Sequence, residues 1–170
     1  MNAYSITFDG RVLNRGFWLY VIDIGTPLGQ RLYVGRTGDS SSANASSPFS
    51  RIGQHLDLRP RAKGNALARN LLGAGIDPAT CSMEMIAVGP IFPEEKEFAS
   101  HRRIRDQVAA LEKGLAQALQ ERGYTVLGKH SSSVPAEPGK LAEITSLVET
   151  RLRNRRPHNI ALHPTGSVQS

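Results

Sequence analysis

Two runs of apolar, aromatic and β-branched residues, joined by a turn, constrain the fold of this 170-residue chain more than any other segment. The first run extends from Gly16 to Ile24 and the second from Gln30 to Arg36. Between them, Thr26-Pro27-Leu28-Gly29 has the composition of a tight turn. Strands with so short a connection pair antiparallel, so we expect a β-hairpin at the centre of the structure.

Other extended segments lie on both sides of this hairpin in the sequence. The pair Asp9-Gly10 favours a tight turn between two short apolar segments, and it predicts a further hairpin over residues 4–13. Ser82 to Val88 predicts a third strand, and Tyr124 to Leu127 a short extended piece.

Helical patterns fill most of the remaining chain. The longest helix is predicted from Pro93 to Gly123, with an apolar stripe made of Ile104, Val108, Leu111, Leu115 and Leu119. Shorter helices are predicted from Ser47-Pro48 to a stop at Pro60, from Asn65 to Leu72, and from Lys140 to Arg156. These elements predict an α/β protein of the α+β kind, in which helices flank a small three-stranded, mainly antiparallel sheet.

The predicted elements group into one domain over residues 1–130, with its core at about 16–130. Residues 131–139 have the composition of a linker, and residues 140–156 form the C-terminal amphipathic helix. Residues 157–170 show no periodicity and are expected to be a disordered tail. The polar stretch from Gly38 to Ser47 is expected to be a surface loop.

The composition limits the class of protein. The longest apolar run, Phe17 to Ile22, is far shorter than the ~18 residues that a membrane span needs. No secretory signal is visible, and the single cysteine, Cys81, excludes an intramolecular disulfide. We therefore expect a cytoplasmic protein that contacts no membrane. Its net charge of +6 is compatible with a polyanionic partner.

Five side chains form the candidate site. Tyr20 and Tyr33 lie on the two strands of the central hairpin, while Arg51 and His55 are four residues apart and share one face of a helix. We expect this basic pair to face a cleft or solvent instead of the core. Glu112 has no Lys or Arg three or four residues away in its helix. A lone carboxylate flanked by small side chains suits a divalent cation, and a solvated surface glutamate is the alternative.

In order and spacing, these motifs resemble the GIY-YIG nuclease family over roughly residues 16–130. Trp18-Leu19-Tyr20 matches the first family motif and Tyr33-Val34-Gly35 the second. Arg51 and His55 match the Arg-x-x-x-His element, and Glu112 matches the helical glutamate.

The chain departs from the family pattern in two places. Trp18 and Leu19 replace the glycine and isoleucine of the first motif. Gly128 replaces the asparagine that usually follows the closing Gly-Tyr-x-Val-Leu segment, and Lys129 or His130 is the alternative source of that polar contact.

The resemblance implies a metal-dependent endonuclease that hydrolyses DNA phosphodiester bonds by one-step attack of water. Glu112 would hold Mg²⁺ or Mn²⁺, and Arg51 offers a charged fork that matches phosphate. Tyr20 would be the general base, assisted by His55 or Tyr33. The implied products carry a 5′-phosphate and a 3′-hydroxyl.

Basic and polar residues near these motifs are candidates for contacts with the nucleic-acid backbone. They are Arg36, Arg59, Arg61, Lys63, Asn65 and Arg69, in addition to Lys129 and His130. A solvated charged surface is the alternative for each of them. RNA is the alternative substrate, and the sequence predicts no oligomeric state. A catalytically impaired nucleic-acid-binding protein and a protein-interaction domain are the alternative functions.

Overall fold

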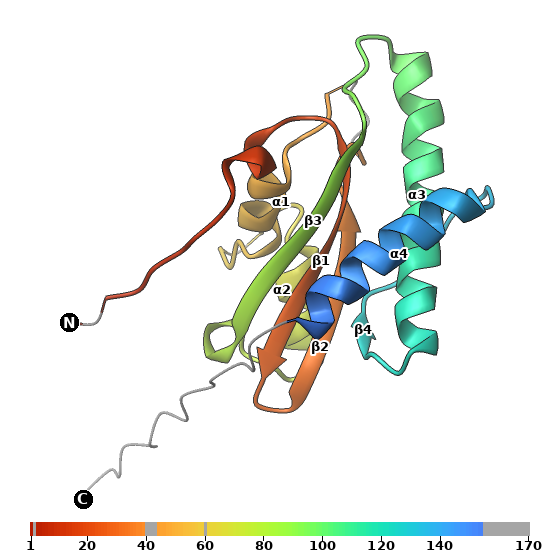
Figure 1. Ribbon diagram of the computed structural model, residues 1–170. Helices are drawn as coiled ribbons and strands as arrows, with labels where there is room; N and C mark the ends of the chain where they lie inside the picture. The colour runs from red at the N-terminus through yellow and green to blue at the C-terminus, as the bar shows by residue number, and fades with distance from the viewer. Residues whose placement is uncertain (2, 40–43, 60, 155–170) are drawn as a thin grey trace, which may run out of the picture.

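The computed structural model of this protein describes residues 1, 3–39, 44–59 and 61–154. Within them, four strands form one mixed sheet in the order β3-β1-β2-β4 (Figure 1). β1 pairs antiparallel with β2 and with β3, and β2 pairs parallel with β4. The strands are β1 (Phe17–Thr26), β2 (Gly29–Arg36), β3 (Ser82–Phe92) and β4 (Val126–Leu127).

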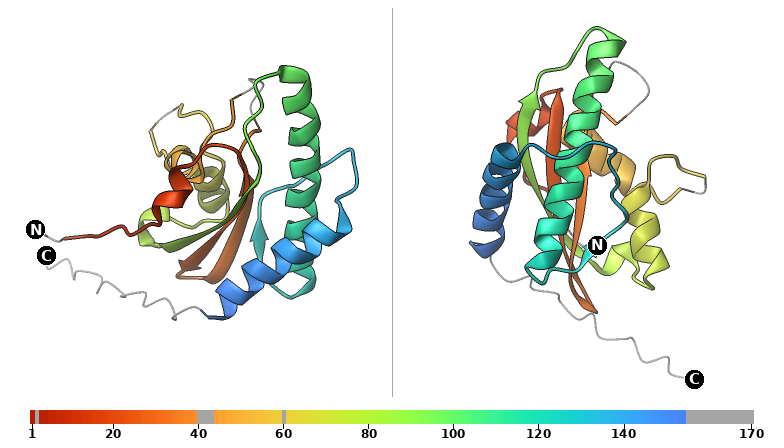
Figure 2. Two further views of the ribbon diagram at one scale, coloured as in Figure 1. Left: turned by 45° about the horizontal axis from the view of Figure 1, so that its top comes forward. Right: turned by 90° about the vertical axis from the view of Figure 1, so that its right-hand side faces the viewer.

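Helices cover both faces of this sheet. As Figure 2 shows, α3 and α4 lie on one face and α1 and α2 on the other. The helices are α1 (Pro48–His55), α2 (Ala66–Gly73), α3 (Phe98–Glu121) and α4 (Pro138–Arg153). Two short 3₁₀ turns, η1 (Gly10–Leu13) and η2 (Pro78–Thr80), complete the described elements.

The central strand β1 is buried along its whole length, because both of its faces are covered. Its side chains alternate between two cores, as the period of a strand requires. Phe17, Leu19 and Val21 pack with α3 and α4, whereas Tyr20 and Ile22 belong to the core beside α1 and α2. This double coverage explains why β1 has no polar-apolar alternation in its sequence.

The structure confirms the central hairpin and the general α+β class. Tyr20 lies opposite Gly35 in the antiparallel register of β1 and β2, and Ile22 lies opposite Tyr33. The prediction of three strands is wrong, because β4 adds a fourth that pairs parallel with Leu32 and Tyr33. Two residues give too weak a signal to predict a strand. The long connection that a parallel pair needs is the chain between β2 and β4, which contains α1, α2, β3 and α3.

The predicted N-terminal hairpin is absent from the described residues 3–13. The Asp9 carboxylate accepts a hydrogen bond from the Arg11 amide and caps η1, so this pair begins a 3₁₀ turn instead of joining two strands. The Phe8 ring contacts the ring of Phe49 on α1, with their centroids 4.7 Å apart.

Several predicted helix boundaries shift. The longest helix begins at Phe98 instead of Pro93, because Glu94 pairs with Arg15 and accepts a hydrogen bond from the Ala45 amide. α1 ends at His55, ahead of the predicted stop at Pro60.

The C-terminal helix begins at Pro138, within the predicted linker, because the Glu137 carboxylate accepts hydrogen bonds from the amides of Gly139 and Lys140. The tail predicted over residues 157–170 lies outside the described residues, as do positions 155–156 of the predicted helix. Among the described helices, none is long and apolar enough to cross a membrane.

Candidate active site

Two tyrosines and a histidine meet on the face of the sheet that α1 and α2 cover. The Tyr20 hydroxyl lies 2.5 Å from His55 Nε2, and the Tyr33 ring meets the His55 ring edge-on at 5.1 Å between centroids. Tyr20 is completely buried, His55 is 2% exposed and Tyr33 is 8% exposed. The prediction that His55 faces a cleft or solvent is therefore wrong, because the two tyrosine rings enclose it.

Gly35 makes room for the Tyr20 ring. A Cβ atom at Gly35 would lie 2.5 Å from Tyr20 Cε2 and 2.6 Å from the Tyr20 hydroxyl oxygen. Only glycine at position 35 leaves room for the Tyr20 ring. The glycine of the second motif is therefore needed for the position of the tyrosine of the first motif.

Gly35→Ala is therefore expected to lower the free energy of unfolding by about 2–3 kcal/mol, because Tyr20 is enclosed and cannot move aside without repacking. Urea denaturation measures this change. Gly53→Ala is the matched control, since a Cβ at Gly53 in α1 meets open space. The control is expected to gain about 0.5–1 kcal/mol from helix propensity. Equal stability of the two variants would show that Gly35 has no packing role.

Burial dominates the protonation of these three groups. It lowers the pKa of His55 to about 4, and the neighbouring positive charge of Arg51 acts in the same direction. Burial also raises the pKa of Tyr33 to about 12, and it raises the pKa of Tyr20 well above its ordinary value although Arg51 opposes the shift. At neutral pH, His55 is thus uncharged and both phenols keep their protons.

Arg51 lies one helical turn before His55 in α1. The side chain of Ser47 caps this helix and Pro48 occupies its first turn, which fixes the start of the helix. The guanidinium is held from two sides: Nη2 lies 2.8 Å from Asp39 Oδ2, and Nη1 donates a 2.8 Å hydrogen bond to Gln54 Oε1.

Glu112 reaches the site through Arg36. The Glu112 carboxylate forms an ion pair with the guanidinium of Arg36 at the end of β2, while the Arg36 carbonyl oxygen lies 3.4 Å from the Tyr20 hydroxyl. Burial raises the pKa of Glu112, and the positive charge of Arg36 opposes this rise. As expected, Glu112 has no ion-pair partner within α3, but Arg36 on β2 forms an ion pair with it.

A divalent cation at Glu112 would have this single carboxylate as its protein ligand. Mg²⁺ commonly binds through one or two carboxylates and completes its shell with water and substrate phosphate. The Glu112 side chain is 12% exposed, and a cation would have to displace Arg36 from it. In the described part of the chain, no group of three His, Cys, Asp or Glu side chains could hold a metal by itself.

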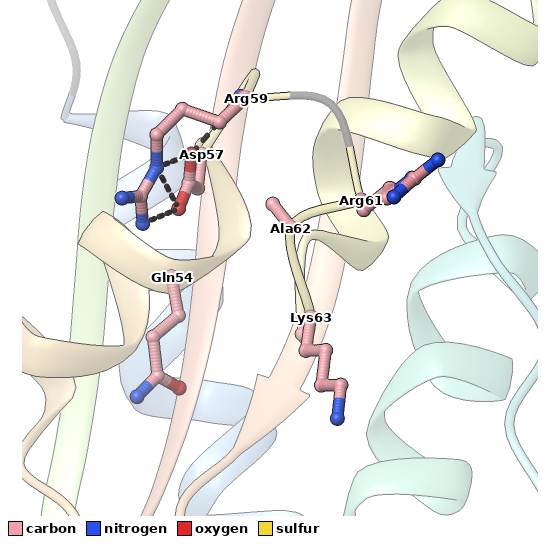
Figure 3. Close-up of a pocket in the computed structure, with 7 residues that line it drawn as sticks. Gln54, Asp57, Arg59, Arg61, Ala62 and Lys63 are labelled. Carbon is pink, nitrogen blue, oxygen red and sulfur yellow. Dashed lines mark hydrogen bonds and ion pairs between the residues drawn. The ribbon is translucent and has the colours of Figure 1, made fainter.

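A basic hollow adjoins the site at Gln54, the residue that contacts Arg51. It measures about 710 Å³ and is lined by Gln54, Asp57, Arg59, Arg61, Ala62, Lys63 and Gly64. Arg59 donates hydrogen bonds to the Asp57 carboxylate, whereas Arg61 and Lys63 extend away from that pair (Figure 3). Three of the predicted nucleic-acid-binding residues therefore share one hollow.

The remaining predicted contacts are dispersed around this region. The Asn65 side chain donates a hydrogen bond to the Asp57 carbonyl, and Arg69 is exposed on α2. His130 Nε2 lies 3.0 Å from the Val34 carbonyl oxygen at the edge of β2, and Lys129 is exposed.

The positive φ of +91° at Gly128 explains the glycine at this position. A Cβ there would lie 3.4 Å from Asn70 Nδ2 and 3.8 Å from Tyr33 Cε2. The Asn70 side-chain amide of α2 thus lies close to Gly128, the position at which the family pattern has its own asparagine. Neither Asn70 nor Asp39 belongs to a sequence motif, so the sequence analysis could not identify either of them as part of the site.

No family model, curated protein or solved structure matches the chain. The resemblance to GIY-YIG nucleases therefore rests on the motif residues of the sequence alone.

Proposed function

We propose that this protein is a metal-dependent endonuclease of the GIY-YIG type that hydrolyses phosphodiester bonds in DNA. The observation that carries the proposal is the 2.5 Å contact between the Tyr20 hydroxyl and His55 Nε2. Arg51 lies on the same helix as His55, and the Arg36–Glu112 pair adjoins Tyr20 through the Arg36 carbonyl. These groups supply a proton acceptor, a phosphate ligand and a cation ligand.

Tyr20 and His55 act as a proton relay in this mechanism. The Tyr20 hydroxyl takes a proton from the attacking water while its own proton moves to the uncharged Nε2 of His55. A concerted transfer is required, because burial raises the pKa of Tyr20 and a free phenolate would be strongly unfavourable. The oxygen of the water forms the new bond to phosphorus.

Arg51 and Glu112 would stabilise the negative charge of the phosphate, Arg51 directly and Glu112 through a bound cation. The Arg51 guanidinium binds the phosphoryl oxygens as a bidentate donor. Glu112 would hold the divalent cation, which supplies electrostatic stabilisation of the departing 3′-oxygen when it is bound. The leaving oxygen takes its proton from solvent, which gives a 5′-phosphate and a 3′-hydroxyl.

The hollow beside Gln54 supports DNA as the substrate. Arg61 and Lys63 line it and can bind phosphates next to the one at Arg51. Such contacts hold the backbone of the nucleic acid without reading its sequence.

The test is cleavage of supercoiled plasmid by the purified full-length chain. Open-circular DNA is expected with Mg²⁺ or Mn²⁺ and not with EDTA, because the phosphate needs a cation at Glu112. End-labelled duplex would reveal the 5′-phosphate product. No cleavage with either ion, at protein concentrations that shift the DNA in a gel, would exclude the endonuclease.

A catalytically impaired nucleic-acid-binding protein is the second candidate. The complete burial of Tyr20 favours it, as do the internal ion pairs of Arg51 and Glu112. This candidate predicts a gel shift without cleavage in Mg²⁺, Mn²⁺ or Ca²⁺. A protein-interaction domain would instead bind no DNA, or bind it without dependence on salt.

A further inference from the structure

Asp39 lies among the candidate catalytic groups, although no motif includes it. Its Oδ2 atom is 2.8 Å from Arg51 Nη2. Its negative charge adds to the effect of burial in raising the pKa values of Tyr20, Tyr33 and Glu112. Through its contact with Arg51, Asp39 thus lies beside the group to which the proposed mechanism assigns the substrate phosphate.

The hydrogen bonding of Arg51 is incomplete in this arrangement. Nη1 is bonded to Gln54 and Nη2 to Asp39, but Nε is buried and has no hydrogen-bond partner among the described residues. A buried donor without a hydrogen bond is unfavourable, and an oxygen-rich ligand at Arg51 would offer it an acceptor. A phosphate has more acceptor oxygens than a carboxylate, and it binds a guanidinium in the same forked geometry.

The two partners differ in exposure. The Asp39 side chain is 36% exposed, whereas the Arg51 side chain is 14% exposed and remains bonded to Gln54. Asp39 can therefore turn toward water while Arg51 stays in place.

We propose that Asp39 occupies, in the free protein, the place on Arg51 that a backbone phosphate of the nucleic acid takes, so that the phosphate must displace it. The inference rests on the proposed function in one respect, namely that Arg51 binds phosphate. Asp39 then acts as an internal competitor that weakens the binding of phosphate groups. A residue that merely positioned Arg51 would have the opposite effect when removed.

The experiment measures the affinity of the full-length chain for a fluorescein-labelled 20-base-pair duplex by fluorescence anisotropy in EDTA, where no cleavage occurs. Asp39→Asn is expected to bind about tenfold more tightly than the wild type, because the competing charge is gone. Asp106→Asn is the matched control: it removes the same charge from an ion pair with Arg105 on α3 and is expected to gain less than about threefold.

A double-mutant cycle with Arg51→Gln completes the test. In that background, Asp39→Asn is expected to gain no more than Asp106→Asn does, because the competition requires Arg51. Weaker binding by Asp39→Asn, or a gain equal to that of the control, would overturn the role of Asp39 while leaving the proposed function in place. If Arg51→Gln binds as tightly as the wild type, the phosphate role of Arg51 fails, and the inference fails with it. Thermal melting checks that each variant is folded.

Discussion

Glu112→Gln is expected to reduce the rate of plasmid nicking in Mg²⁺ by about 10³-fold while the fold and the affinity for DNA in EDTA stay close to those of the wild type. Glutamine has the size of glutamate, and its amide oxygen can still accept a hydrogen bond from Arg36. What it lacks is the negative charge that would hold a cation beside the phosphate. Losing a single electrostatic stabiliser of the transition state commonly reduces rates by about 10²–10³-fold.

Glu121→Gln is the matched control, because it removes the same charge from an exposed position at the end of α3. It is expected to cleave at the wild-type rate. Binding of Mn²⁺, followed by electron paramagnetic resonance, gives a readout independent of cleavage and is expected to weaken in Glu112→Gln alone. Nicking by Glu112→Gln at the control rate would remove Glu112 from the mechanism.

The sequence predicts this site best where a local pattern determines the geometry. Apolar strands with a short turn define the hairpin, and its antiparallel register brings Tyr20 opposite Gly35. The Ser47-Pro48 cap likewise defines the start of α1 and the face that carries His55. In both cases, neighbouring residues in the chain decide the structure.

Contacts between distant segments escape the same reasoning. Arg36 and Glu112 are 76 residues apart, and each looks unpaired within its own element. Asp39 follows a glycine in a polar stretch and has no periodicity to mark it, yet it binds Arg51. Side-chain pairing across elements depends on how α1, β2 and α3 pack, which no local pattern describes.

Some local signals were outweighed by tertiary contacts. Pro93 followed by two glutamates is typical of a helix start, but Glu94 instead bonds Arg15 and the Ala45 amide. Asp9-Gly10 is a hairpin signal in isolation, but the described N-terminal segment has no second strand with which to pair. In both segments, contacts with other parts of the fold, or the lack of a pairing strand, determined the local structure.

Acidification from pH 7 to pH 4 is expected to destabilise the wild type by about 3 kcal/mol more than it destabilises His55→Gln. Burial lowers the pKa of His55 from 6.5 to about 4 in the folded protein. Between these two values the unfolded chain binds a proton that the folded chain does not. The free energy of unfolding is thus highest above pH 6.5 and falls as the pH drops toward 4.

Urea denaturation of both proteins at pH 7, 5.5 and 4, followed by far-UV circular dichroism, measures this difference. Carboxylates that titrate in the same range contribute equally to both proteins, so the difference isolates His55. If the free energies of unfolding of the wild type and of His55→Gln fell in parallel with pH, His55 would be protonated in the folded state at mildly acidic pH. An imidazolium could not accept the Tyr20 proton, so the same curves would also exclude His55 as the acceptor in the proton relay at such pH values.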